Sequence, residues 1–280
     1  MTAPTARNLP ALLQLLRDDG FTGTVRVSGQ PGGTIHLRDG LIGAIETPGA
    51  PPLTSTLLAS GRIGDEEWLA ACAEQPDADR LGGHLVAAGL IGAAELEVVA
   101  TAAVFDGAFA MALSPPGDRE LGEPEPALVA EPGVEPRRLT EETSRRMSLL
   151  SRLWGPPGEL TRVRPVIVPP SGGARTGGWL TPGQRGVLDS VNGRRTPRDI
   201  AFARGRGLYA VLLDLVRLEA LGLVSWERRA ASGTRPSTAP RVPTTDASAA
   251  APPPRTAALP RRRPGGGLPG HDPGRKGRGG

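Results

Sequence analysis

The side chains that could carry out chemistry are few, and they lie far apart along the chain. His36, His84 and His271 are the three histidines, and none has a partner at helical spacing. Cys72 is the single cysteine, so it forms no disulfide within the chain, which fits a reducing compartment. A metal site or a nucleophile with its base needs several such groups within reach of one another. The sequence therefore predicts neither.

Phosphate chemistry also lacks its usual residues. A Walker A loop needs a lysine directly after its glycines, but the only lysine, Lys276, lies near the C-terminus. The glycine-rich run 29–33 precedes an expected strand rather than a helix, which favours a hairpin turn over an anion cradle. Acid pairs at 66–67 and 141–142 lie at expected helix starts, where the helix dipole accounts for them. We therefore expect no enzyme, no catalytic residue, no cofactor, no metal and no small-molecule substrate.

The positive charge of the chain belongs to its C-terminus. Residues 228–280 contain eleven bases and two acids, a net charge of +9, whereas the remaining residues hold 22 bases and 27 acids, a net charge of −5. The sequence pI of about 10.3 is thus no indication of a basic folded domain. The most apolar run, 85–113, contains Glu95, Glu97 and Asp106, which are costly at a bilayer centre. Without a membrane span or an export signal, the prediction is a cytoplasmic protein.

The first 46 residues have the pattern of a helix followed by an antiparallel meander. Leucines at 9, 12, 13 and 16 keep helical spacing, and strand-like runs follow at 24–27, 34–37 and 41–45. The Asp39-Gly40 pair suits a type I′ hairpin turn, which needs positive φ at both central positions. One face of the sheet is expected to be buried, and its side chains are those of Val25, Val27, Ile35 and Leu37. The other face is expected to be exposed to solvent, and its side chains are those of Thr24, Arg26, His36 and Arg38.

An internal repeat follows. Residues 57–68 align with residues 85–96 at a constant offset of 28, and each copy has two glycines around an isoleucine. Each first glycine suits a left-handed helix cap, so we expect two stacked helical hairpins. Their second helices carry acidic residues that would repel phosphate, so this part, including Trp68, is expected to act as scaffold or to face a protein.

The second half of the chain predicts a winged-helix-like domain and a tail. Residues 114–138 have the Pro/Gly/Glu composition of a solvated linker, 139–153 a helical spacing, and 163–168 the pattern of an extended edge segment. Thr181-Pro182 and Thr196-Pro197 are helix starts, which predict helices at 182–191 and 197–204. A third helix at 208–221 and a strand at 223–226 complete the motif.

Part of the chain resembles a known family. Residues 9–46, with the strand 23–27 and the Arg38-Asp39-Gly40 turn, resemble the PatA N-terminal-like domain of bacterial signalling proteins. The helical repeat resembles the extension usually attached to that domain, and residues 180–226 resemble a winged-helix-like module found at the C-terminus of such proteins in actinobacteria. The resemblance implies a protein-interaction domain in signalling and supplies no catalytic residues.

The predicted fold class is α+β: a small antiparallel sheet with helices and a helical-hairpin repeat, then a winged-helix-like domain and a disordered tail. The predicted domains are a PatA N-terminal-like interaction domain at 7–113, an acidic Pro/Gly linker at 114–138, a helix plus extended segment at 139–177, a winged-helix-like domain at 178–228 and a disordered basic tail at 229–280.

The predicted function is that of a non-enzymatic bacterial regulatory protein that binds a partner protein or itself, and the alternative is a winged-helix regulator that binds DNA. The third helix is apolar apart from Arg217 and two acids, which favours protein docking over base reading. The candidate protein-interaction surface comprises Trp68, Leu208, Tyr209, Leu212 and Val216. The candidate contacts to DNA or another anion are Arg194, Arg195, Arg198, Arg204, Arg206, Arg228 and Arg229. The basic tail could hold nucleic acid electrostatically or be a solvated extension.

Overall fold

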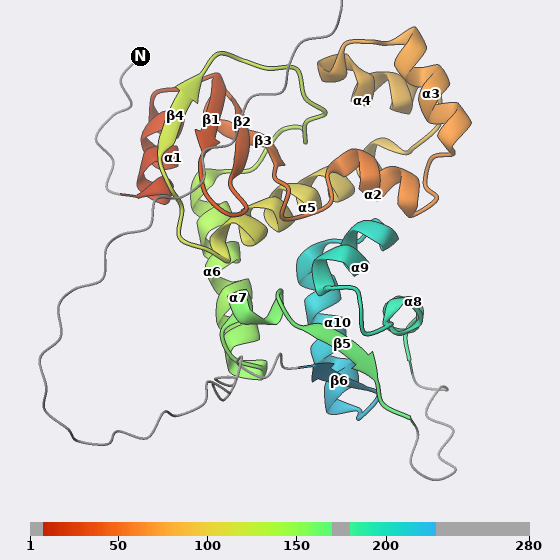
Figure 1. The fold of residues 1–280 in the computed structure, drawn as a ribbon. Coiled ribbons are helices and arrows are strands. Elements are labelled where there is room, and N and C mark those ends of the chain that lie inside the picture. The colour runs from red at the N-terminus through yellow and green to blue at the C-terminus, as the bar shows by residue number, and fades with distance from the viewer. Residues whose placement is uncertain (1–7, 170–179, 228–280) are drawn as a thin grey trace, which may run out of the picture. The chain divides into compact units, whose positions relative to one another are not determined.

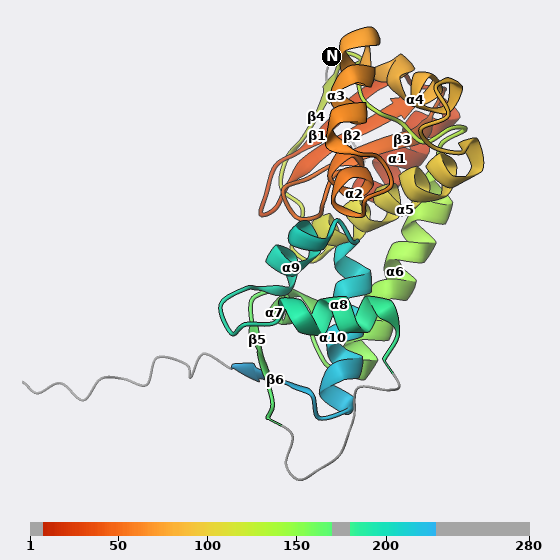
Figure 2. The ribbon, with the colours of Figure 1, turned by 90° about the vertical axis from the view of Figure 1, so that its right-hand side faces the viewer.

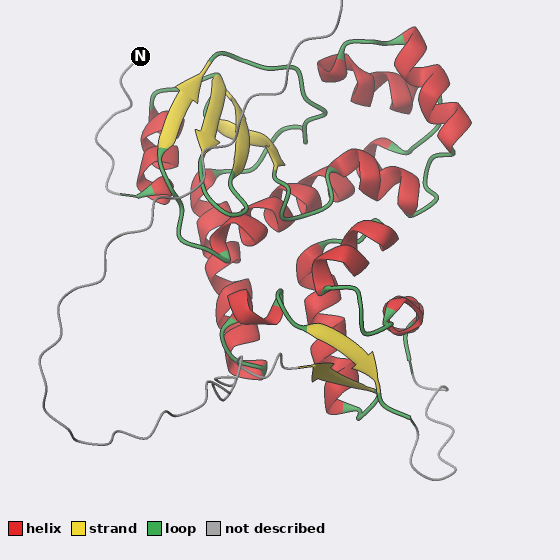
Figure 3. Ribbon diagram, viewed as in Figure 1, coloured by secondary structure: helices red, strands yellow, loops and turns green. Residues whose placement is uncertain are grey.

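The computed structural model describes residues 8–169 and 180–227, and the predictions for the tail lie outside these residues. The fold is α+β, as predicted (Figures 1 and 3). Its elements in chain order are α1 (Leu9–Asp18), β1 (Gly23–Val27), β2 (Gly33–Arg38), β3 (Leu41–Glu46), α2 (Leu53–Ala59), α3 (Asp65–Glu74), α4 (Ala78–Ala87), α5 (Ala93–Ala112), β4 (Arg119–Gly122), α6 (Pro136–Leu153), α7 (Pro157–Leu160), β5 (Arg164–Ile167), α8 (Pro182–Ser190), α9 (Pro197–Arg204), α10 (Leu208–Ala220) and β6 (Val224–Glu227).

The N-terminal meander is confirmed, and a fourth strand extends it. The sheet has the order β3-β2-β1-β4, and all of its pairings are antiparallel. Asp39 and Gly40 have φ angles of 49° and 73°, as a type I′ turn requires. The predicted inner face is buried, but the prediction that Thr24 and His36 face solvent is wrong, because both are buried.

The segment after β4 covers these two residues, and the prediction of a solvated linker at 114–138 is wrong for this part. The crossing segment, residues 123–134, starts beside β1, where the Glu123 carbonyl accepts a hydrogen bond from the Thr24 hydroxyl, 3.1 Å away. It ends on the opposite edge strand β3, where Ile42 and Val134 exchange two backbone hydrogen bonds. The segment therefore passes over the outer face of the sheet and gives it a second apolar layer.

The helical repeat is confirmed. Helices α2 and α3 form the first hairpin, and α4 and α5 form the second (Figure 2). Gly61 and Gly89 have nearly equal φ angles of 70° and 71°, so each supplies the left-handed cap that an L side chain would strain. Ile63 and Ile91 are buried at the two corners. The repeated glycines and isoleucines thus build the same turn twice.

The C-terminal elements form a three-helix unit with a two-stranded sheet. Thr181 and Thr196 cap α8 and α9 through capping boxes, as the Thr-Pro pairs predicted. Strand β6 pairs antiparallel with β5, which precedes the three helices in the chain. None of the helices in residues 8–169 and 180–227 is long and apolar enough to cross a membrane.

Two hydrophobic cores hold these elements, and α5 contributes to both. Val99 and Val104 belong to the core beneath the sheet, whereas Phe109 and Ala110 belong to the core around α10. Helix α6 also reaches both cores, through Leu139 and Leu150. We call residues 8–135 the sheet lobe and residues 136–227 the helical lobe. The two lobes share helices and apolar surface rather than meeting at a polar linker.

The crossing segment makes a prediction for stability. The Val134 side chain is 1% exposed, so Val134→Ala should lower the free energy of unfolding by about 2 kcal/mol through lost apolar burial and a small cavity. The half-exposed Val129 of the same segment is the matched control, and Val129→Ala should cost less than half as much. Urea unfolding measures both, and equal stability of Val134→Ala and the wild type would contradict the role of this segment in the core.

Candidate functional site

The chemistry-bearing residues lie on separate elements of the fold. His36 lies in β2, Cys72 in α3 and His84 in α4, where its imidazole is 3.3 Å from the carboxylate of Glu74. No group of three or more His, Cys, Asp or Glu side chains that could hold a metal ion occurs in the described part of the chain. The densest polar constellation is instead at the junction of the two lobes, around Asp106.

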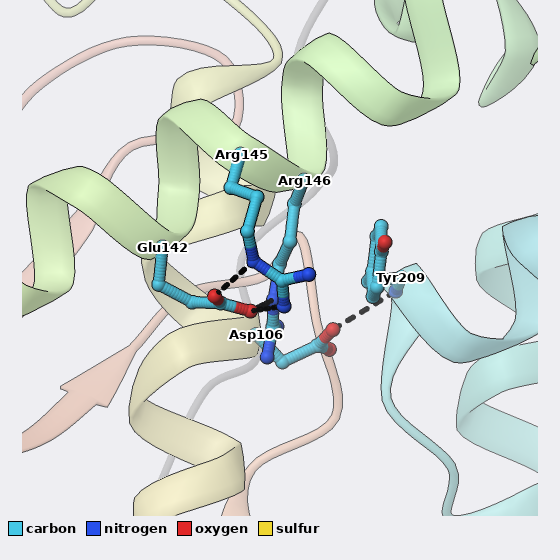
Figure 4. Close-up of polar contacts among 5 residues, drawn as sticks. All are labelled: Asp106, Glu142, Arg145, Arg146 and Tyr209. Carbon is cyan, nitrogen blue, oxygen red and sulfur yellow. Dashed lines mark hydrogen bonds and ion pairs between the residues drawn. The ribbon is translucent and has the colours of Figure 1, made fainter.

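Asp106 connects α5 to the start of α10. Its Oδ2 accepts a hydrogen bond of 2.6 Å from the backbone N–H of Leu208, and its Oδ1 accepts one of 2.9 Å from the N–H of Tyr209. The carboxylate points from α5 to the start of α10 (Figure 4). Residue 106 is only 4% exposed. The first N–H groups of a helix have no partner within the helix, and the helix dipole favours a negative charge there. A side chain about one hundred residues upstream therefore caps α10.

Two glycines allow this approach. A Cβ atom on Gly207 would lie 3.0 Å from the Asp106 carboxyl carbon, closer than such contacts normally come. Gly205 caps α9 with a φ of 54°, and a Cβ there would lie 2.7 Å from the Ala59 Cβ on α2. Between them, Arg206 donates to the Gly183 carbonyl at 3.0 Å and pairs with Asp214 at 2.9 Å. The Gly-Arg-Gly turn is therefore shaped by its contacts with both lobes.

Helix α6 contributes a cation, the guanidinium of Arg146, to the junction. The Arg146 guanidinium lies 4.8 Å from the ring centre of Tyr209 and 5.5 Å from that of Phe105. Glu142 accepts hydrogen bonds of 2.7 Å from both Arg145 and Arg146 (Figure 4). This arrangement orients Arg146 over the aromatic face, where a partly desolvated cation–π contact is stabilising. Three helices, α5, α6 and α10, thus meet around one carboxylate and one guanidinium.

The two carboxyl groups of the junction respond to pH in opposite directions. Burial raises the pKa of Asp106 above its ordinary value, and the N–H groups of Tyr209 and Leu208 only partly offset this effect. Hydrogen bonds from Arg145 and then Arg146 lower the pKa of Glu142 to about 2, although burial opposes them. The stabilisation from Glu142 is therefore present above its ordinary pKa and is lost as the pH falls towards 2, whereas the contribution of Asp106 declines as the pH rises through its raised pKa.

The predicted protein-interaction surface on α10 is wrong. Leu208, Leu212 and Val216 are buried within the second core, and Tyr209 is half-buried in an edge-to-face contact of 5.3 Å with Phe109. The apolar face of α10 packs against the chain itself, because α8 and α9 cover most of it and α5 and α6 cover the rest. Trp68 is half-buried against the sheet-lobe core, whereas the α10 residues belong to the second core.

The arginines predicted to contact DNA or another anion differ in their exposure. Arg194, Arg195, Arg198 and Arg204 are exposed, whereas Arg206 is held by Asp214. The turn at 192–195 carries Arg194 and Arg195, and the Arg164 guanidinium donates a hydrogen bond of 2.9 Å to the Arg194 carbonyl. These three arginines therefore form a small basic group. Arg228 and Arg229 lie outside the described residues.

Sequence reasoning did not single out Asp106, Glu142 or Arg146 as a site. A signal for Asp106 was available, because it is the one charged residue in the apolar run 98–113. A carboxylate in such a run needs donors from elsewhere in the fold.

Comparisons of the chain with protein-family models, with curated proteins and with solved structures found no match. The resemblance to the PatA N-terminal-like domain therefore stays a prediction.

Asp106→Ala should destabilise the protein strongly. The variant leaves the buried N–H groups of Leu208 and Tyr209 without an acceptor, so the free energy of unfolding should fall by about 2 to 4 kcal/mol. Asp189→Ala, at an exposed position on α8, is the control and should change it by less than about 0.5 kcal/mol. Similar losses in the two variants would contradict the capping role of Asp106.

Glu142→Gln tests the pH dependence. At pH 7 the variant should lose about 1 to 2 kcal/mol of stability, and the difference from the wild type should shrink as the pH falls from 5 towards 2, where the wild-type carboxylate becomes protonated. Glu141→Gln, which removes an exposed pair with Arg137, should have little effect at any pH. Urea titrations at several pH values measure both, and a pH-independent difference for Glu142→Gln would refute the assignment.

Proposed function

We propose that the protein is a non-enzymatic, cytoplasmic regulatory protein of a bacterium that acts by binding other macromolecules. The observation that carries the proposal is the opposite charge of its two lobes. Residues 8–135 contain six arginines and nineteen acids, a net charge of −13, whereas residues 136–227 contain fifteen arginines and eight acids, a net charge of +7. Lobes of opposite charge that share their cores present two different surfaces in a fixed relation, and such surfaces select different partners.

A protein partner is the proposed ligand of the sheet lobe. Leu69 on α3 and Val98 on α5 are 68% and 67% exposed, which is the largest exposure among the large apolar side chains of the described residues. Both lie on second helices of the repeat, among the acidic residues that disfavour nucleic acid. The resemblance to the PatA N-terminal-like domain, a protein-interaction domain, supports the same proposal. A partner with apolar side chains among basic residues would complement these two positions.

Affinity capture from the native lysate tests the proposal with matched variants. The wild type should recover a partner or a second copy of itself, and the double variant Leu69→Ser/Val98→Ser should lose it because the apolar contact is gone. Leu15→Ser/Leu221→Ser removes two other exposed apolar residues, which are 43% and 53% exposed, and should retain the partner. Recovery of the same proteins by all three, or of neither partner nor dimer by the wild type, would count against the proposal.

DNA is the second candidate ligand, and the exposed arginines of the helical lobe favour it. Arg194, Arg195 and Arg198 lie around the start of α9 and could contact phosphates. The buried third helix argues against reading base edges in the major groove. We therefore propose that any DNA binding is electrostatic and not selective for sequence.

Fluorescence anisotropy with short duplexes tests this second candidate. Affinity for the full chain should fall steeply with salt and be equal for unrelated sequences, and Arg194→Glu/Arg195→Glu/Arg198→Glu should weaken it about tenfold at low salt. The control is Arg17→Glu/Arg62→Glu/Arg80→Glu, which changes the net charge equally on the sheet lobe and should weaken it less. Selective, salt-resistant binding would refute the electrostatic mode.

A further inference from the structure

An apolar cavity opens between α1, α5 and α6, beside the β1–β2 loop. Its volume is about 730 Å³, within the range of sites for small molecules. Apolar walls come from all three helices and from the sheet, including Leu13, Ile35, Ile45, Met111, Leu139 and Met147. Several of these side chains belong to the sheet-lobe core, so the cavity is continuous with that core rather than a feature of a mobile loop.

The lining of this cavity contains no charged side chain. Its polar groups are the Gln30 amide and a set of hydroxyls, those of Ser28, Ser114, Thr140, Thr143, Ser144 and Ser148. A charged ligand would lose its hydration here without gaining a countercharge, which is strongly unfavourable. The chemistry of the walls therefore selects an uncharged ligand with a largely apolar body.

One of these hydroxyls is unsatisfied. The Thr143 Oγ1 is buried and has no hydrogen-bond partner among the described residues. Thr140, one turn earlier on the same helix, donates from its Oγ1 to the Pro136 carbonyl at 2.9 Å, which is the usual arrangement for a helical threonine. A buried polar group without a partner is costly and rare in folded proteins. The Oγ1 atom is also closed off from the cavity, so a hydroxyl or carbonyl group of a ligand would supply the missing partner after the Thr143 side chain turns to the second χ1 rotamer that helical threonines adopt.

We propose that this cavity binds an uncharged small molecule with a long apolar body and one hydroxyl or carbonyl group, which pairs with the Thr143 hydroxyl. The site is independent of the protein and DNA surfaces proposed above. It lies on the helix that also carries Glu142 and Arg146, so an occupied cavity would stabilise α6 where α6 meets the lobe junction. Such a ligand would bind the folded state only and would raise the unfolding temperature.

Displacement of an uncharged fluorescent probe from the full-length protein tests the site. N-Phenyl-1-naphthylamine should bind saturably, and 1-decanol should displace it at a concentration about tenfold lower than decanoate does at pH 8, because only decanoate must bury a charge. The same order should appear in the rise of the unfolding temperature. Absence of saturable probe binding, or equal competition by the alcohol and the carboxylate, would overturn the proposal.

Two isosteric variants test the role of the hydroxyl. Thr143→Val should raise the unfolding temperature of the free protein, since it removes an unsatisfied group, and should weaken 1-decanol about fivefold. Thr140→Val, in the same wall, should lower the unfolding temperature and leave 1-decanol binding within about twofold. Equal effects of the two variants on the alcohol would overturn the pairing with Thr143. Probe binding that requires self-association would assign the cavity to a second copy of the chain and overturn the small-molecule site.

Discussion

The structure depends on one constraint, the compensation of a carboxylate in an apolar interior. Asp106 lies among the buried side chains of α5, and its charge would be costly there without donors. The first two N–H groups of α10 supply them, at 2.6 and 2.9 Å. Each group offsets part of the cost of the other, because the helix start lacks acceptors and the carboxylate lacks donors. This exchange fixes α10 against α5, and the glycine turn before α10 has the shape that the approach requires.

The constraint determines which surfaces remain for function. Once α10 is held against α5 and α6, its apolar residues complete the core and are not offered to a partner. What remains outside is charge of opposite sign on the two lobes, together with single exposed apolar residues, of which Leu69 and Val98 are the most exposed. Under the proposed function, recognition would then rely on the relation between these two charged surfaces. The apolar cavity beside α6 is a separate feature of the same packing.

Local patterns predicted most of the elements, because they depend on neighbours in sequence. The Asp39-Gly40 turn, the caps at Gly61 and Gly89, and the Thr-Pro helix starts each follow from residues within one turn. The errors concern pairs that are distant in sequence. The crossing segment looked like a linker because its composition is polar and proline-rich, yet Ala127, Ala130 and Val134 are buried, and the last two are hydrogen-bonded to β3. The donors of Asp106 were equally invisible, since they lie about one hundred residues further along the chain.

The claim that the junction makes the two lobes one cooperative body is tested most directly by scanning calorimetry of the full-length protein. The account predicts a single transition, with equal calorimetric and van't Hoff enthalpies, since neither core is complete without α5 and α6. Two resolved transitions, with the helical lobe unfolding while the sheet lobe stays folded, would contradict it.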